Sequence, residues 1–280
     1  MENNLFIKQP GYPMRILLIL FFFGSISSIR AQSTASKNVS QFSIYSTELD
    51  TIKKIWIYLP VSYKTSGKNY PVLYLQDAQN LFDNTTSFAG EWRVDETLDS
   101  LGLDLIVVGI EHGNDKRIDE LTPFSHPTYH GGKADVYLEF ITQTLKPKID
   151  LKYRTASGRS STFIGGSSLG GLFAYYSILQ HPEIFSKALV FSPSFWFSEE
   201  IFAFTHQKTP ESFQEMKLFL LAGNKESETM VPLMMKMRQI LIDKGVSMCD
   251  INSKAIFEGT HSEKFWAAQF PEAAIWLLED

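Results

Sequence analysis

The sequence predicts a single α/β domain built on a mostly parallel β-sheet. Short, continuously apolar segments recur along the chain, and segments with helical periodicity separate them. Strands that alternate with crossover helices form parallel sheets with right-handed connections. With 280 residues, of which 44% are hydrophobic and 14% aromatic, the chain can bury the core that such a domain needs.

Two kinds of strand are expected. Residues 41–47 and 52–59 alternate apolar and polar side chains, which predicts an antiparallel pair at an edge of the sheet. Strands that are buried on both faces are continuously apolar instead. This second pattern covers residues 72–75, 105–110, 162–164, 188–191 and 218–222, and a last strand is expected at 251–257.

Helical patterns lie between these strands. Apolar side chains form one stripe along residues 134–145, and Pro147 is expected to end that helix. The other expected helices cover residues 95–101, 169–180, 231–244 and 262–268. The predicted architecture is therefore a mostly parallel central sheet with an antiparallel N-terminal edge and helices on both faces.

Residues 1–31 differ from the rest and predict a signal peptide. Arg15 precedes the apolar run 16–23, small and polar residues follow it, and Ala31 stands before a polar segment. The apolar run is shorter than the roughly 20 residues that span a bilayer. We expect cleavage after Ala31, a single domain over residues 32–280, and a periplasmic or secreted location without stable membrane insertion. An uncleaved membrane anchor is the alternative.

Charge and cysteine content exclude several classes of partner and site. The chain has 26 basic and 31 acidic residues, a net charge of −5, and no basic cluster, so no nucleic-acid partner is expected. Its single cysteine, Cys249, excludes an intramolecular disulfide framework, a cysteine-based zinc site and an iron–sulfur cluster.

A Gly-x-Ser-x-Gly motif at residues 166–170 marks the candidate nucleophile, Ser168. The motif lies between an expected strand and an expected helix, which is the setting of a nucleophile elbow. A strained turn there holds the hydroxyl clear of the sheet, at a helix N-terminus where the Leu169 amide can donate to an oxyanion. A glycine-rich turn without chemistry is the alternative.

Chain order selects the partners of this serine, because triads of this architecture follow the order Ser, acid, His. Three histidines follow Ser168, and His261 comes just after the last expected strand, where the general base belongs. His181 suits a helix C-terminal cap, and His206 lies in a polar stretch. We therefore expect His261 to be the base, with helix capping as its alternative role.

The loops after two other strands should complete the site. The acid is expected just after residue 222, where Glu226 is preferred over Glu228 because it lies nearer the strand end. Solvated loop charges are the alternative for both glutamates. The loop after the first buried strand should supply a second oxyanion donor, with the Gln79 amide as the candidate and Asp77 as a brace.

These segments together resemble the putative esterase (esterase-D-like) family of the α/β-hydrolases. The motif at 166–170, the loop 77–83 and Gly259-Thr260-His261 carry the resemblance, which runs from about Ile52 to the C-terminus. Further segments typical of the family are Glu91-Trp92, Tyr153-Arg154-Thr155 and Ser192-Pro193-Ser194-Phe195-Trp196. Ala78 stands where the family often has glycine.

The resemblance implies a catalytic triad of Ser168, His261 and Glu226, with the amides of Gln79 and Leu169 as the oxyanion hole. Some siderophore esterases of the family work without a well-placed acid, so a Ser–His dyad stays open. The implied activity is that of a serine carboxylic-ester hydrolase, which works through an acyl-enzyme and needs no metal or organic cofactor.

Export disfavours S-formylglutathione hydrolysis, which is cytosolic. Acylated saccharides with feruloyl or acetyl esters are the expected substrates, and a ferric siderophore of the enterobactin trilactone type is the alternative. The pocket rim is expected to include Trp92, Arg117, Phe195 and Trp196, with packing as the alternative role of each. An acyltransferase and a catalytically silent binding module on the same fold are the other classes considered.

Overall fold

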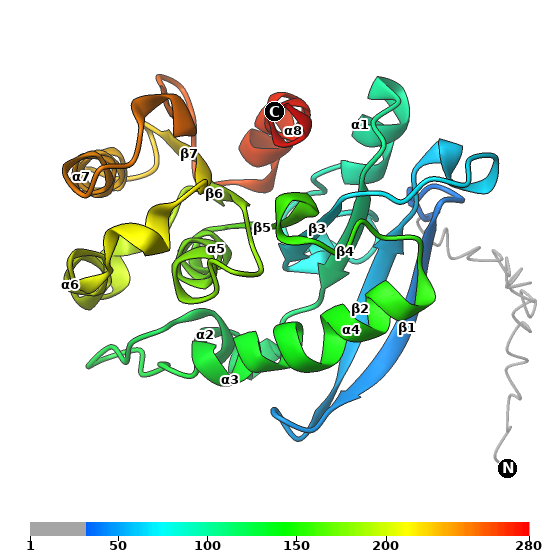
Figure 1. The fold of residues 1–280 in the computed structure, drawn as a ribbon, viewed down its shortest axis with the longest axis horizontal. Coiled ribbons are helices and arrows are strands. Elements are labelled where there is room, and N and C mark those ends of the chain that lie inside the picture. The colour runs from blue at the N-terminus through cyan, green and yellow to red at the C-terminus, as the bar shows by residue number, and fades with distance from the viewer. Residues whose placement is uncertain (1–31, 280) are drawn as a thin grey trace, which may run out of the picture. The chain divides into compact units, whose positions relative to one another are not determined.

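The computed structural model of the chain describes residues 32–279, so the expected signal peptide lies outside the described residues. In the described part, eight strands form one sheet in the order β1-β2-β4-β3-β5-β6-β7-β8 (Figure 1). The strands are β1 (Val39–Ser46), β2 (Thr51–Tyr58), β3 (Val72–Gln76), β4 (Ile106–Ile110), β5 (Thr162–Ser167), β6 (Lys187–Phe191), β7 (Lys217–Gly223) and β8 (Ile251–Ile256).

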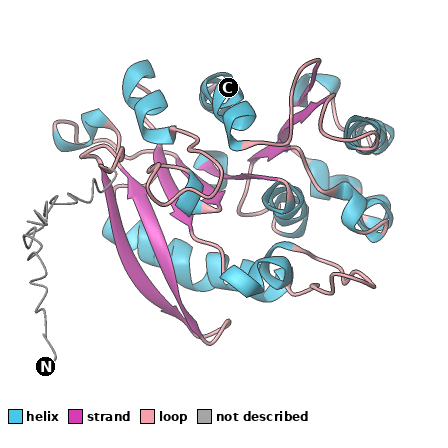
Figure 2. Ribbon diagram, turned by 180° about the vertical axis from the view of Figure 1, so that it is seen from behind, coloured by secondary structure: helices cyan, strands magenta, loops and turns pink. Residues whose placement is uncertain are grey.

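The first two strands form the antiparallel edge that the sequence predicts. β1 pairs with β2 and β2 pairs with β4 in antiparallel fashion, whereas all other neighbours are parallel. Figure 2 shows this long β1–β2 pair at one side of the sheet. Every residue of β3, β4, β5 and β6 is buried, as expected for strands that are covered on both faces. The predicted fold class is therefore confirmed.

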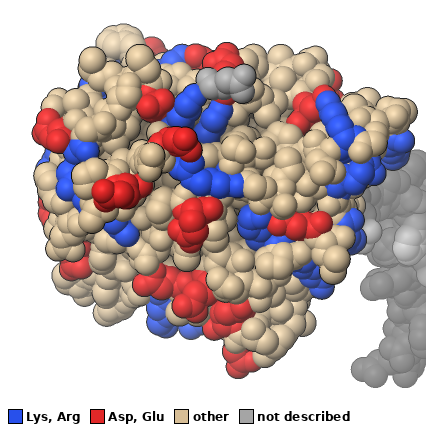
Figure 3. Space-filling model, in the orientation of Figure 1, with Lys and Arg blue, Asp and Glu red and all other residues tan. Residues whose placement is uncertain are grey.

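Helices cover both faces of the sheet, and the sheet separates two apolar cores (Figure 1). One face carries α1 (Val94–Leu101) and α8 (Glu263–Leu278). The other face carries α2 (Arg117–Leu121), α3 (Ala134–Glu139), α4 (Lys146–Lys152), α5 (Leu169–Gln180), α6 (Glu200–Gln207) and α7 (Met230–Asp243). No helix between residues 32 and 279 is long and apolar enough to cross a membrane. Figure 3 shows acidic and basic side chains interspersed over one face of the molecule.

Two helices continue past the ends that the sequence predicts. α3 passes into the π-helical segment Phe140–Leu145 and then into α4, which holds Pro147 in its first turn. The helix changes its hydrogen-bond pattern just before the proline, where the Lys146 N–H donates to the Ile141 carbonyl five residues earlier, and this π-helical turn accommodates Pro147. α8 continues beyond residue 268 to Leu278, since Phe270 and Leu277 are buried against the sheet.

The parallel strands direct their carboxyl ends to one edge of the sheet, where ligand sites of such folds lie. Ser167 at the end of β5 pairs with Phe191, and Phe191 at the end of β6 pairs with Leu221 of β7. Gly223 at the end of β7 pairs with Ile256 at the end of β8. The loops after these four strands therefore begin side by side.

Candidate active site

Ser168 occupies the sharp turn between β5 and α5. Its φ of 59° and ψ of −123° are rarely adopted by an L-residue. The backbone is held on both sides: the Ser168 N–H donates to the Phe191 carbonyl at 2.9 Å, and the Ser168 carbonyl accepts from Leu172 and Ser194 at 3.0 and 3.1 Å. This geometry is that of a nucleophile elbow.

The two glycines of the motif allow this turn. A Cβ placed on Gly166 would lie 2.7 Å from the carbonyl carbon of Gly170, so no side chain fits between strand and helix. The close approach places Ser168 directly at the N-terminus of α5, whose free amides favour negative charge. The neighbouring Leu169 amide belongs to this N-terminus.

His261, in the loop after β8, is bound to Glu226, in the loop after β7. The His261 Nδ1 atom lies 2.7 Å from Glu226 Oε2. The imidazole side chain is 37% exposed, whereas the Glu226 side chain is only 1% exposed. A buried carboxylate on Nδ1 fixes the tautomer of the ring and directs basicity to the other nitrogen. Glu228 is exposed on the same loop.

Two glycines bring these loops into contact. A Cβ on Gly223 would lie 2.2 Å from the Gly259 carbonyl oxygen, and a Cβ on Gly259 would lie 2.7 Å from the Gly223 Cα. The Lys225 N–H donates to the Gly259 carbonyl at 2.9 Å. Because the backbones pass this closely, Glu226 can reach His261 across two loops.

The Glu226 carboxylate accepts further hydrogen bonds. Ser192 Oγ and the Gly223 N–H donate to its Oε1 atom at 2.7 and 2.6 Å. The Trp266 indole N–H in turn donates to Ser192 Oγ at 2.8 Å, and the Trp266 ring meets the His261 ring edge-on with centroids 4.9 Å apart. This network fixes both the acid and the imidazole in one orientation.

The Ser168 hydroxyl is close to another serine. Its Oγ lies 3.4 Å from Ser194 Oγ, and among the described residues no hydrogen bond joins it to His261. Hydrogen bonds between a nucleophile and its base are often long without substrate and shorten in the complex. Ser168 and His261 therefore lie at the same edge of the sheet, with no hydrogen bond between their side chains.

The loop after β3 lies against the N-terminus of α5. A Cβ on Gly170 would lie 3.5 Å from Asp77 Oδ2. Arg117 donates two hydrogen bonds of 2.8 Å to the Asp77 carboxylate. Burial alone would raise the pKa of Asp77, but the charge and hydrogen bonds of Arg117 outweigh it and hold that pKa below its usual value. Arg117 thus braces Asp77, at the start of the loop that carries Gln79, where it faces Gly170 of α5.

Ala78 fits the position where the resembled family often has glycine. The positive φ of this loop, 58°, falls on Asp77, and Ala78 begins the short 3₁₀ helix that follows. Its methyl group is buried opposite Gly109, where an added Cβ would lie only 2.9 Å away. The alanine therefore requires no unusual backbone conformation.

Two of the residues expected at the pocket rim are core residues, which corrects that expectation. Trp92 is 3% exposed and stacks on Phe191 with ring centroids 5.5 Å apart. Phe195 is fully buried and meets the Tyr175 ring edge-on. Both side chains are buried in the core, so neither forms the exposed aromatic rim that the sequence suggests.

The other two expected rim residues differ from each other. Arg117 is committed to Asp77 and braces the loop. Trp196 is 46% exposed, and its ring meets the half-exposed Tyr129 ring at 6.1 Å. Because Trp196 follows Ser194 by two residues, this aromatic pair is a candidate contact surface for substrate.

A comparison with family models decides the identification. The model described as Putative esterase matches residues 46–277. The chain belongs to this family. It is an esterase, so the family and the esterase activity that the sequence resemblance implied are confirmed.

The esterase is similar to proteins of several organisms. The uncharacterized protein YbbA of Bacillus subtilis is 27% identical over 236 residues, which are 80% of this chain and 92% of YbbA. The siderophore enterobactin esterase of Emericella nidulans is 31% identical over 152 residues, 48% of this chain and 49% of that protein. This second match therefore spans about half of the relative's length.

A solved structure confirms the α/β-hydrolase fold of the esterase. A ferulic acid esterase superposes with a TM-score of 0.67 at 18% identity, over 85% of this chain and 96% of the other. At this identity the similarity concerns the fold alone.

Sequence reasoning missed the residues that hold the acid of the esterase. The sequence marks Ser192 only as part of a segment typical of the family, and it assigns no role to Trp266. Ser192 follows β6 directly and has a positive φ of 44°, a conformation that a serine adopts only when its surroundings impose it. A serine at the carboxyl end of a parallel strand was the available signal.

Proposed function

We propose that this esterase hydrolyses carboxylic esters through an acyl-enzyme on Ser168. The supporting observation is the strained turn at Ser168 beside the Glu226–His261 pair at one sheet edge. In the first step Ser168 Oγ attacks the ester carbonyl and His261 accepts the hydroxyl proton, while Glu226 stabilises the imidazolium. The amides of Gln79 and Leu169 donate to the oxyanion that forms.

The remaining steps use the same groups. The imidazolium gives its proton to the departing alcohol, and a water molecule then takes the place of that alcohol. His261 removes a proton from this water as it attacks the acyl carbonyl, and the acid leaves as Ser168 regains its proton. No cofactor takes part in these proposed steps.

We propose a siderophore ester as the natural substrate class. The relative from Emericella nidulans is named as an enterobactin esterase, whereas the ferulic acid esterase shares only the fold. The exposed Trp196–Tyr129 pair suits an aromatic ring of the substrate. Acylated saccharides, the substrates expected first from the sequence, stay a prediction that the same experiment tests.

A substrate panel tests this function. We expect the full chain to hydrolyse p-nitrophenyl acetate, and to act on a ferric triscatecholate trilactone with a kcat/KM at least roughly tenfold above that for methyl ferulate and acetylated xylan. A higher kcat/KM on methyl ferulate or acetylated xylan would instead indicate that acylated saccharides are the substrate class. Product formed only when a sugar acceptor is added would indicate an acyltransferase, and failure to react with every ester would contradict the proposed function.

We propose that residues 1–31 direct export and are removed after Ala31. The basic start, the short apolar run and the small residue at the junction support this. N-terminal sequencing of the protein from its native envelope fraction is expected to begin at Gln32. An intact N-terminus in the cytosol would contradict the proposal, and an intact N-terminus in the membrane fraction would indicate an anchor.

A further inference from the structure

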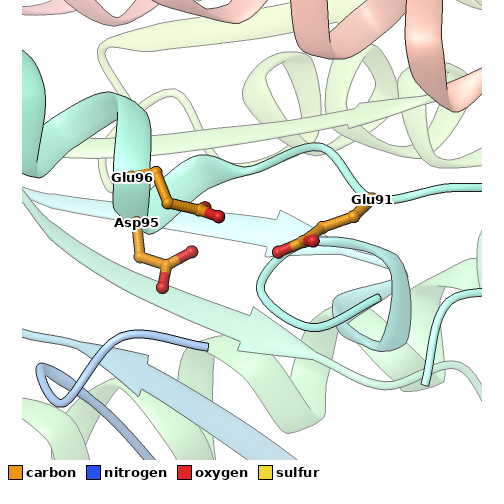
Figure 4. Close-up of side chains that lie close together, drawn as sticks. All are labelled: Glu91, Asp95 and Glu96. Atoms are coloured by element: carbon orange, nitrogen blue, oxygen red, sulfur yellow. The ribbon is translucent and has the colours of Figure 1, made fainter. Parts of the chain in front are cut away.

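Three carboxylates that belong to no part of the proposed triad converge at the start of α1. Glu91 precedes the helix, and Asp95 and Glu96 lie in its first turn. One oxygen from each lies within 4.8 Å of the other two. Figure 4 shows the three carboxyl groups pointing toward a common space.

Each of these carboxyl groups has one buried oxygen without a donor. Glu91 Oε1, Asp95 Oδ1 and Glu96 Oε2 are shielded from solvent and accept no hydrogen bond from the described residues. Asp95 gives the strongest argument for a bound cation, because this residue is fully buried. Its other oxygen already accepts from the Ser36 N–H at 2.6 Å, so Oδ1 needs a separate partner. A buried carboxylate oxygen without a proton or a cation is strongly unfavourable.

The described surroundings do not neutralise this charge. Arg93 donates to Glu96 at 3.4 Å, but its side chain is 67% exposed and such ion pairs are weak. Asp83 adds negative charge beside Glu91. The N-terminus of α1 offsets only about half a charge.

We propose that Glu91, Asp95 and Glu96 bind a calcium ion through one oxygen of each carboxylate. Calcium takes six to eight oxygen ligands at about 2.3–2.6 Å, so two of its ligands can lie up to about 5 Å apart. The observed separations within 4.8 Å meet that limit. Magnesium needs opposite ligands about 4.2 Å apart, in a stricter octahedral arrangement. Water molecules would supply the remaining calcium ligands.

The ion would connect segments that lie next to the active site. Thr34 donates to Glu91 at 2.8 Å, and residues 33–36 thereby join the cluster. Trp92 follows Glu91 directly, and its ring meets Trp266 with centroids 5.9 Å apart. Since Trp266 donates to Ser192 in the Glu226 network, calcium would stabilise the side of the domain on which that network rests.

Thermal unfolding of the full chain tests the proposal. After dialysis against EDTA and then buffer at about pH 8, 5 mM CaCl₂ is expected to raise the midpoint by about 3–6 °C, and 5 mM MgCl₂ by less. A calorimetric titration with CaCl₂ should give one site with a Kd on the order of 10⁻⁴ to 10⁻³ M. No midpoint shift together with no binding heat would overturn the proposal.

Variants locate the ion. Asp95→Asn keeps the shape of the side chain and is expected to abolish the calcium response. Glu139→Gln is the matched control, because Glu139 is an exposed carboxylate on α3, and it should respond as the wild type does. If Asp95→Asn does not fold, Glu96→Gln, at a partly exposed residue, should weaken calcium binding at least roughly tenfold. An unchanged Kd in the variant that folds would overturn the assignment.

A shared proton is the competing explanation, and pH separates the two. Burial, followed by the neighbouring Glu96, raises the pKa of Asp95 to about 7. The other titratable groups around the cluster are Glu91, Asp83, Arg93 and Tyr58.

Because the pKa of Asp95 is higher in the folded protein than in the unfolded chain, the calcium-free protein loses stability as pH rises toward 7. Calcium replaces the proton, so its effect should be larger at pH 8 than at pH 5.5. A loss of stability with rising pH that CaCl₂ leaves unchanged would favour the proton and overturn the calcium site.

Discussion

Ser168→Ala is expected to lower kcat for ester hydrolysis by on the order of 10⁶, with little change in the thermal midpoint. The loss follows from removal of the attacking oxygen. Stability should change little because Ser168 Oγ has only a 3.4 Å contact with Ser194 Oγ, while the turn itself is held by backbone hydrogen bonds that alanine also makes. Steady-state kinetics with p-nitrophenyl acetate and a thermal melt measure the two quantities.

Ser167→Ala is the matched control for this experiment. Ser167 is the last residue of β5 and directly precedes Ser168, but its side chain is buried. The control should keep turnover within a few-fold of the wild type. Wild-type turnover in Ser168→Ala would remove the acyl-enzyme mechanism, and a comparable loss in both variants would indicate damage to the turn rather than to the chemistry.

The position of Ser168 could be predicted because its determinants are local. A buried strand, a Gly-x-Ser-x-Gly turn and a helix follow one another within 20 residues, so the local sequence is enough to predict the nucleophile elbow. The same holds for the sheet, where doubly buried strands show as continuous apolar runs. Chain order then suggested His261, and the structure places it beside Glu226.

The contacts around the acid could not be predicted, because they join distant segments. Ser192 and Trp266 meet across 74 positions in the sequence, and the meeting depends on how β6 and α8 pack. The approach of Gly223 to Gly259 likewise depends on the register of β7 and β8. Glu226 and Glu228 have the same chemistry, so only the path of the loop distinguishes them.

The errors at the pocket rim have a related cause. Aromatic residues in loops suit both a binding surface and a core, and sequence does not tell which way a loop side chain points. Trp92 and Phe195 pack inside the domain, whereas Trp196, next to Phe195, is exposed. The prediction that a helix ends at Pro147 is also wrong, because the place of this proline in the first turn of α4 depends on the π-helical segment before it.

Glu226→Gln is expected to lower kcat by about 10² to 10⁴. The carboxylate accepts from His261, Ser192 and the Gly223 N–H, and an amide in its place turns one acceptor into a donor. The imidazole then loses the partner that fixes its tautomer and stabilises its positive charge. Kinetics at about pH 8, where ordinary histidines are neutral, keep a change in histidine protonation from being mistaken for loss of the acid.

Glu228→Gln provides the comparison, because it makes the same chemical change in the same loop at an exposed position. It should leave kcat within about twofold of the wild type, as a solvated charge normally does. A large loss in Glu228→Gln with little loss in Glu226→Gln would transfer the role of the acid to Glu228. If neither variant loses more than a few-fold, Ser168 and His261 act as a dyad. In that case the buried Glu226 carboxylate holds the loops after β7 and β8 together. Glu226→Gln should then lower the thermal midpoint, while kcat stays within a few-fold of the wild type.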